Sequence, residues 1–434
     1  MQVRRSICIL VDAYSTANSL AKVFAGYGFG SIHVQSHRCL PAVLLDTFEP
    51  HDFLQAFVYD GDFERLMSDL SLTRYDIKCV VAGAETGVTL ADRLSECLGL
   101  PSNGTALSEA RRNKHVMGET VKAAGLRTIP QLKARVLEEI VAWVTNHGFS
   151  EVVLKPLSSS GANGFRLCRT LGELRTAFAE VYRSKDIFGT VVEDVLVQEY
   201  VDGAEVSVNT VSCHGRFLVS DVWHTRKRVD GQAKVYDLET LLDDQHPLYD
   251  LCVAYVEQVL HALRIDFGPA HTEVLVDAQG PVLIETGARF MGSTAQSLVT
   301  EAFGMNSVLL TAEAFLAPDQ FATRLARPAP TMRQRANMVQ MLSDREGTLR
   351  RYGLKELVSL TTFHGVDLYL DSGDPVRRTI DSYSSPGLIF LSGDDNEKLL
   401  HDYSAIRRME ENGRLYEIVP VDRYSSGEGR GSGD

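Results

Sequence analysis

Two apolar segments near the middle of the chain, 272–276 and 282–285, restrict its fold more than any other feature. They read TEVLV and VLIE, and a glycine-containing turn separates them. A three-residue loop at 278–280, with glycine in the left-handed position, is a known hairpin form. That register predicts that Glu273 lies directly opposite Glu285 on one face, whereas a four-residue loop would place the two on opposite faces.

Facing glutamates suggest a cation between them. Like charges directly opposite each other destabilise a sheet, but Mg²⁺ takes carboxylates together with phosphate oxygens. An exposed hairpin with two solvated glutamates is less expected, because both strands are otherwise strongly apolar. Arg289 follows in TGARFMGS. An arginine there would stabilise charge on a transferring phosphoryl group or a tetrahedral intermediate, unless it forms only a surface ion pair.

The first hundred residues alternate short apolar runs with helix-like stretches. The runs 7–11 and 76–82 predict strands, and the stretches 15–26 and 90–98 predict helices, which is typical of a parallel α/β sheet. No GxGxxG follows the first strand, so the dinucleotide-binding fingerprint is absent. Glu85 follows the second run, where ligands gather in such sheets, although a simple turn before the next helix explains it equally well.

Two lysines lie within or beside apolar segments of the sequence. Lys114 lies on the same face of a predicted helix, 110–124, as apolar residues, which requires either an anionic partner or a side chain that reaches the edge of that face. Lys155 ends the apolar run VVLKP. The loop that follows consists of small residues whose backbone N–H groups can approach phosphate oxygens, although a plain hairpin turn would look similar. Its candidate phosphate contacts are Ser158, Ser159, Ser160, Gly161 and Gly164. The glycines follow the lysine, so this is not a Walker A loop.

A third candidate segment, LVQEYVDGAEVSV, spans 196–208. It is either an ordinary hairpin that turns at Asp202 and Gly203, or a linker whose backbone groups meet a flat base while a carboxylate takes ribose hydroxyls. The residues concerned are Glu199, Tyr200, Val201 and Glu205.

Composition narrows the class of protein. The length of 434 residues suggests two to four domains, and the net charge of −13 argues against nucleic acid or an anionic membrane as the main partner. Seven scattered cysteines without a CxxC pair are typical of a reduced, cytoplasmic protein. The first apolar run is too short for a signal peptide or a membrane span.

Taken in order, RNKHVM, VVLKP, the small-residue loop, QEYVDGAEVSV and HTEV…LIETGARFMG resemble the ATP-grasp superfamily over about residues 75–300. Within it the chain is most similar to the L-amino-acid ligases, with GAETGV and PGLIFLSG as further points of likeness. The resemblance implies an α/β fold with a parallel-sheet N-terminal domain, two lobes that clasp ATP, and a small C-terminal α/β subdomain. The expected units are 1–107, 108–322 with a mobile lid at about 146–202, 323–424, and a disordered tail at 425–434.

The resemblance also implies roles. Lys114 and Lys155 would hold the α- and β-phosphates under the loop 158–164. Backbone groups of Glu199 and Val201 would read adenine, with Glu205 toward ribose or substrate. Glu273 and Glu285 would hold two Mg²⁺ ions, with Mn²⁺ as an alternative. The γ-phosphoryl group would pass to a carboxylic acid, and an amine would attack the acyl phosphate while Arg289 stabilises the oxyanion.

Two positions depart from that family. Gly287 stands where the superfamily often has a third metal ligand, Asn, two residues after the second glutamate. Leu242 stands three residues after Glu239, where some amino-acid ligases have a Glu-x-x-His pair that contacts the first substrate. His224 and Arg226 are the candidate substitutes, and Ser293 is small enough to leave room for a larger acid.

Three other functions remain open from the sequence: an ATP-grasp carboxylase, a ligase of nucleotide biosynthesis, and a non-catalytic nucleotide-binding protein. The presence of both lysines and both glutamates argues against lost catalysis. Partners would be a small carboxylic acid and an amine, and the family suggests a homodimer.

Overall fold

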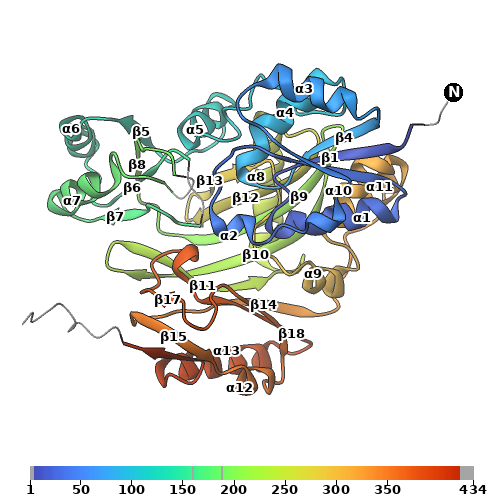
Figure 1. The fold of residues 1–434 in the computed structure, drawn as a ribbon. Coiled ribbons are helices and arrows are strands. Elements are labelled where there is room, and N and C mark those ends of the chain that lie inside the picture. The colour runs from blue at the N-terminus through green and yellow to red at the C-terminus, as the bar shows by residue number, and fades with distance from the viewer. Residues whose placement is uncertain (1–3, 159–160, 187–188, 421–434) are drawn as a thin grey trace, which may run out of the picture.

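The computed structural model describes residues 4–158, 161–186 and 189–420 (Figure 1). Ser159 and Ser160 of the predicted phosphate loop, and the predicted tail 425–434, lie outside these residues. None of the helices in the described ranges has the length and apolar character needed to cross a bilayer.

The chain begins with a four-stranded parallel sheet, which confirms the α/β prediction. Its order is β3-β2-β1-β4. The strands are β1 (Ser6–Val11), β2 (Gly30–Gln35), β3 (Gln55–Val58) and β4 (Asp76–Ala82). The predicted helix at 15–26 begins as a 3₁₀ turn, η1 (Ser15–Ser19), and continues as α1 (Leu20–Gly26).

Helices cover both faces of this sheet, as its unbroken apolar strands require. Apolar residues of α3 and α4 pack on one face, and α1 packs with α10 on the other. The helices and turns of this part are α2 (Ala42–Leu45), η2 (Pro50–Asp52), α3 (Phe63–Leu72), η3 (Glu85–Gly87) and α4 (Val88–Cys97).

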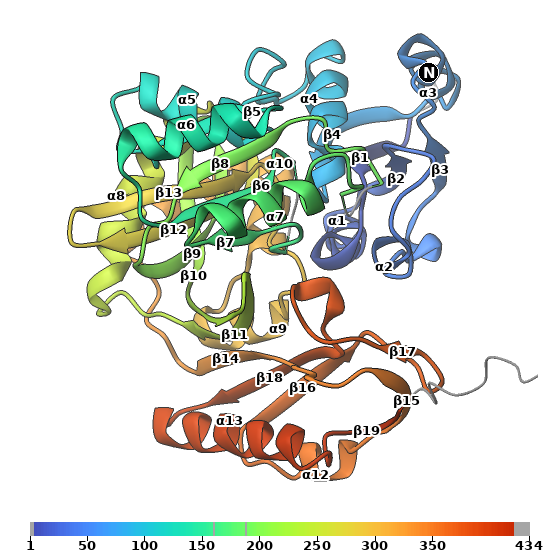
Figure 2. The same cartoon turned by 90° about the vertical axis from the view of Figure 1, so that its left-hand side faces the viewer.

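A small antiparallel sheet with two helices projects from the centre (Figures 1 and 2). Its order is β5-β8-β6-β7, and it has its own apolar core with α6 and α7. The elements are β5 (Gln131–Ala134), α6 (Leu137–His147), β6 (Val152–Pro156), β7 (Arg166–Cys168), α7 (Leu171–Val181) and β8 (Val195–Glu199). It overlaps the segment predicted to be a lid.

The centre of the molecule is an eight-stranded antiparallel sheet of order β13-β12-β9-β10-β11-β14-β18-β16. Its first five strands are β9 (Ala204–Cys213), β10 (Arg216–Asp230), β11 (Ala233–Leu241), β12 (Gly268–Asp277) and β13 (Gly280–Gly287). Helices pack on it: α5 (Lys114–Ala123), α8 (Pro247–Ala262), α9 (Gln296–Phe303), α10 (Ser307–Leu316) and α11 (Pro318–Leu325). The helix expected at 110–124 therefore begins four residues later, where Asn113 caps it.

Strands β8 and β9 do not form a hairpin. β8 pairs with β5 and β6, whereas β9 pairs with β10 and β12. The four residues between them link two different sheets, so this segment is a linker and the hairpin interpretation is wrong, while its contact with a base and a ribose stays a prediction.

The C-terminal part continues the central sheet rather than starting a sheet of its own. β14 (Arg335–Gln340) pairs with β11, and β18 (Gly387–Gly393) and β16 (Phe363–Leu368) follow. A second, three-stranded sheet and two helices complete this part, with β15 (Gly347–Tyr352), α12 (Leu354–Val358), β17 (Pro375–Val376), η4 (Ser382–Ser384), α13 (Asn396–Glu411) and β19 (Tyr416–Val419). The predicted domain boundary at residue 322 therefore stays a prediction, because strands from both sides of it belong to one sheet.

Candidate active site

Two cavities meet above the central sheet. The smaller, about 90 Å³, lies between the small antiparallel sheet and the hairpin β12–β13. The larger, about 360 Å³, lies between the parallel sheet, the central sheet and the C-terminal part. Four residues line both cavities: Gly161, Tyr236, Glu273 and Glu285. Ligands bound in the two cavities would therefore meet beside these four residues.

The smaller cavity collects most of the residues predicted to bind a nucleotide. Its walls include Lys114, Lys155, Gly161, Glu199, Tyr200, Val201 and Glu205. Apolar surface comes from Ile129, Val153, Leu275 and Ile284. Lysines together with apolar walls suit a ligand that joins a phosphate chain to a flat base.

The two lysines are held in different ways. Lys114 begins α5 and forms an ion pair of 2.7 Å with Glu285, so the buried lysine has the anionic partner that its apolar face required. Lys155 lies in β6 and is buried. Burial and the nearby Lys114 lower the pKa of Lys155 to about 8.

Glu205 belongs to a cluster that the sequence did not indicate. Its carboxylate pairs with Lys227 and, at 3.6 Å, with Lys234. Lys227 also lies 4.0 Å from the centre of the Tyr236 ring. Lys227 and Lys234 both line the smaller cavity, which therefore holds four lysines. Their signal in the sequence is weak, because both belong to a hairpin of alternating polar residues, TRKRVDGQAKVY.

Glu273 and Glu285 face each other as predicted, but for a different reason. The turn is tighter than expected, since Asp277 pairs with Gly280 across it. The register then shifts between Glu273 and Val274, which restores the pairing of Glu273 with Glu285. A β-bulge thus does what the three-residue loop was expected to do.

A chain of buried hydrogen bonds fixes Glu273. His271 Nε2 lies 3.2 Å from a Glu273 oxygen, and His271 Nδ1 lies 2.8 Å from Asn209 Oδ1. Asn209 in turn donates to Asp221 at 2.5 Å. Burial acts to raise the pKa of Glu273, but the hydrogen bond from His271 and the charge of Lys227 outweigh it, so this carboxylate stays ionised. In the described residues, no group of three or more His, Cys, Asp or Glu side chains is arranged to hold a metal ion.

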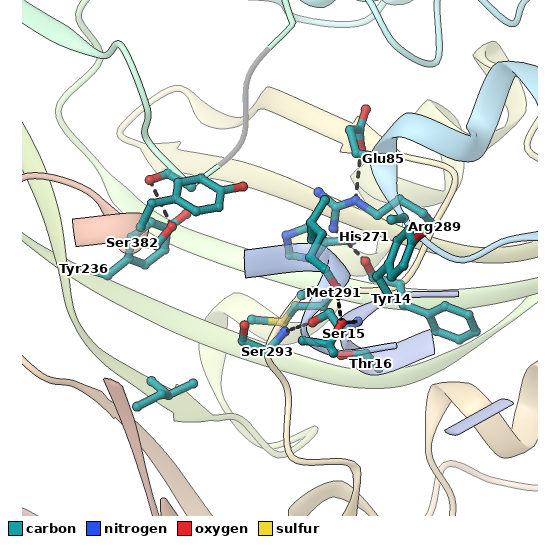
Figure 3. Close-up of a pocket in the computed structure, with 18 of the residues that line it drawn as sticks. Tyr14, Ser15, Thr16, Glu85, Tyr236, His271, Arg289, Met291, Ser293 and Ser382 are labelled. Carbon is teal, nitrogen blue, oxygen red and sulfur yellow. Dashed lines mark hydrogen bonds and ion pairs between the residues drawn. The ribbon is translucent and has the colours of Figure 1, made fainter. Parts of the chain in front are cut away.

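Figure 3 shows the larger cavity, with Glu85 and Arg289 on one side and Tyr236 and Ser382 on the other. Tyr14, Ser15 and Thr16, from the turn after β1, line it together with Met291 and Ser293. The Tyr14 hydroxyl is buried and has no hydrogen-bond partner within the described ranges.

Glu85 and Arg289 are partners. Arg289 Nε donates to Glu85 Oε2 at 2.9 Å, and Arg112 Nη1 donates to Glu85 Oε1 at 2.7 Å. Burial would raise the pKa of Glu85, yet Arg112 and Arg289 outweigh it and lower it to about 2. Gly287 lies beside this pair, where a Cβ atom would lie 2.7 Å from Glu85 Oε2.

Glu239 lies on the wall of the larger cavity with no ion pair among the described residues. Its hydrogen-bond partner is the Thr225 hydroxyl, at 3.4 Å. Burial raises the pKa of Glu239 to about 8, against the opposing charge of Lys227. Leu242 is buried in the core and lines neither cavity.

Some predicted residues are not brought to either cavity. His224 precedes Thr225 in β10, and because strand side chains alternate it lies on the face opposite to Glu239. Arg226 is paired with Asp237 at 2.9 Å and lies over the Tyr403 ring of α13. Neither replaces the histidine missing at 242. Ser158 and Gly164, the two ends of the predicted phosphate loop, line neither of these two cavities.

The loop after β6 is held by the C-terminal part of the chain. Gly161 O accepts hydrogen bonds from Ser382 N at 3.1 Å and from Ser382 Oγ at 3.2 Å. Asn163 donates to Asp381 at 3.1 Å. Ser382 lies more than two hundred residues away from Gly161, so no local sequence signal could have indicated this contact.

The comparisons with known proteins agree with this geometry. Residues 149–297 match the model of the ATP-grasp domain. The chain is 32% identical to dapdiamide A synthase of Enterobacter agglomerans over 419 residues, which are 94% of this chain and 96% of that protein.

Solved structures share the fold. The L-amino acid ligase of Bacillus licheniformis superposes with a TM-score of 0.74 at 17% identity, over 97% of this chain and 100% of that one. The N5-carboxyaminoimidazole ribonucleotide synthetase of Thermotoga maritima has a TM-score of 0.65 at 15% identity, over 96% and 100%.

The relatives that the chain matches show that it is an ATP-dependent ligase that forms carbon–nitrogen bonds. The chain belongs to the ATP-grasp superfamily, in the amino-acid ligase group that its sequence resembles.

Proposed function

We propose that the chain joins a small carboxylic acid, an amino acid or a relative of one, to an amine through an acyl phosphate, with release of ADP and phosphate. One observation carries this proposal: the lysine-lined cavity and the arginine-bearing cavity meet at Glu273 and Glu285. A nucleotide in the first and an acid in the second would bring the terminal phosphate against the carboxylate, which is the arrangement that phosphoryl transfer requires.

On the nucleotide side, Lys114, Lys155 and Lys227 would neutralise the phosphates, and the linker 199–201 would meet the base. Glu205 would contact the ribose from its place between two lysines. Glu273 and Glu285 fit Mg²⁺, since both are half-buried carboxylates and their neighbours keep Glu273 ionised. Two ions, bound with the help of phosphate oxygens, would offset the negative charge that builds up on the transferred group.

On the acid side, Arg289 would meet the carboxylate and later the oxyanion formed when the amine attacks. Tyr14, Ser293 and Glu239 line the remainder of the cavity and would select the body of the acid. The alternative of a carboxylase or a nucleotide-biosynthetic ligase shares this fold, so the two are separated by their substrates and not by their architecture.

The test is to incubate the protein with Mg-ATP and pooled carboxylic acids, with amines or with hydroxylamine, and to identify all products by mass spectrometry. We expect ADP and phosphate in amounts that depend on the acid, and a trapped hydroxamate that names it. Formation of AMP and pyrophosphate would contradict the acyl-phosphate route. Release of ADP that depends on bicarbonate alone would favour the carboxylase.

A further inference from the structure

The carboxylate of Glu85 is already bound by two arginines of the protein. It lies in η3, at the carboxyl end of β4, and both of its oxygens are already used, one by Arg112 at 2.7 Å and one by Arg289 at 2.9 Å. A carboxylate has about four lone-pair directions, so two remain unused, but the charges of Arg112, Arg289 and Lys114 already act on it and disfavour a further cation. Its neighbours, and not a ligand, satisfy its charge.

Arg289 is correspondingly constrained. Its Nε donates to Glu85, and its Nη1 donates to the Phe290 carbonyl at 2.7 Å. Two directions of a planar guanidinium are thereby fixed, which sets the plane of the group. The Nη2 atom has no hydrogen bond or ion pair to a described residue, so one edge of the guanidinium remains for a ligand in the larger cavity.

Gly287 makes this contact sterically feasible. A Cβ atom at 287 would lie 2.7 Å from Glu85 Oε2 and 3.1 Å from Arg289 Nε, both closer than van der Waals contact. Gly287 does not have a positive φ, so backbone conformation does not require glycine there. The space that the Glu85–Arg289 hydrogen bond occupies is what requires glycine at this position.

We infer that Glu85 is a positioning residue that orients Arg289 toward the reacting carboxylate, and that Gly287 is glycine in order to admit it. Arg112 completes the arrangement by neutralising the second oxygen. This inference rests on the proposed function, in which Arg289 meets the acid and the oxyanion. It excludes Glu85 as the group that binds an ammonium ion of the substrate.

The first experiment needs no substrate. Crystal structures of the wild type and of Gly287→Ala are compared at the Glu85–Arg289 contact. We expect the added methyl group to separate Glu85 Oε2 from Arg289 Nε beyond 3.5 Å while the hairpin keeps its pairing. A contact that survives unchanged would overturn the role assigned to Gly287.

The second experiment measures turnover of the acid found with hydroxylamine as the nucleophile, with Mg-ATP saturating. Glu85→Ala should lower kcat by about 10²-fold and leave the KM of the acid within about threefold, because a misplaced catalytic group affects the reaction more than binding. Glu85→Gln should recover part of kcat, since it can still accept from Arg289. A large rise in KM with an unchanged kcat would instead identify a substrate ligand.

A double-mutant cycle tests whether Glu85 and Gly287 act through the same contact. Gly287→Ala should lower kcat by roughly tenfold in the wild type but by less than about twofold when Glu85 is already alanine. Additive losses would contradict the link. Asp277→Ala is the matched control: it removes another arginine-bound carboxylate, from the β12–β13 hairpin that also contains Gly287, with side-chain exposure of 20% against 17% for Glu85, and lies outside both cavities. Wild-type protein without acid-dependent ADP release would count against the proposed function, and the structural comparison would still decide the placement of Glu85.

Discussion

Lys114, the first residue of α5, and Glu285, near the end of β13, form a 2.7 Å ion pair between two segments that are 171 positions apart. The pair lies where the two cavities meet, and both partners are largely buried. A ligand that brings phosphates and a cation to this point would separate the pair, with phosphate taking the lysine and the cation taking the glutamate. In the proposed complex, the same two side chains would therefore receive the phosphates and the cation.

Replacement of this glutamate tests its role. Glu285→Gln keeps the shape but removes the charge, and we expect ADP release at saturating Mg-ATP to fall by about 10²- to 10³-fold. Glu417→Gln, which removes an exposed carboxylate paired with Arg350, should change it by less than about twofold. Retention of most of the activity in Glu285→Gln would remove this residue from the proposed metal site.

The depressed pKa of Lys155, about 8, predicts how nucleotide affinity varies with pH. Below that value the lysine is charged and attracts phosphate; above it, the free protein must take up a proton to bind. The dissociation constant of Mg-ADP should therefore be flat from pH 6.5 to about 7.5 and rise by up to about tenfold per pH unit above 8. Titration calorimetry across this range would show it. Lys155→Arg keeps its charge and should flatten the curve; identical curves for both proteins would show that another group is responsible.

The contact between the loop after β6 and residues 381–382 predicts that the C-terminal part affects the KM for ATP. Asn163→Ala removes the bond to Asp381 without disturbing the hydrogen bonds by which Asp381 caps η4. We expect the KM for ATP to rise by roughly three- to tenfold, because a charge-assisted hydrogen bond contributes about 1 kcal/mol or more. In a background of Asp381→Ala, the same substitution should have almost no further effect on that KM. Equal effects in both backgrounds would mean that the loop does not depend on this turn.

Substitution of Arg111, which lies away from the candidate active site, is expected to have a large effect on stability. It is fully buried, pairs with Asp92 at 3.0 Å and donates to the Leu263 carbonyl at 2.9 Å. Arg111→Met would leave Asp92 buried without its cation, which lowers the free energy of unfolding by about 3–5 kcal/mol. Urea unfolding followed by circular dichroism measures the change. The exposed pair of Arg65 with Asp60 is the control, for which Arg65→Ala should cost less than about 1 kcal/mol.

Much of the local structure could be predicted from the chain. The apolar run 76–82 is β4, and 195–199 is β8, because continuous apolar residues bounded by polar ones specify buried strands. The pairing of Glu273 with Glu285 was also predictable, although its cause, a bulge in place of a longer loop, was not. A bulge depends on how the second strand packs against its neighbours, and periodicity does not report that.

The sequence by itself determined which chemical groups this protein has to work with: two lysines on apolar elements, two glutamates in one hairpin and an arginine four residues after the second. Periodicity and turn chemistry act over a few residues, so they decide such matters. Only the tertiary structure decided which distant groups meet, namely Glu85 with Arg289 across the space at Gly287, and Gly161 with Ser382. Those contacts come from packing between sheets, whose arrangement depends on the whole core and leaves no mark in any short segment.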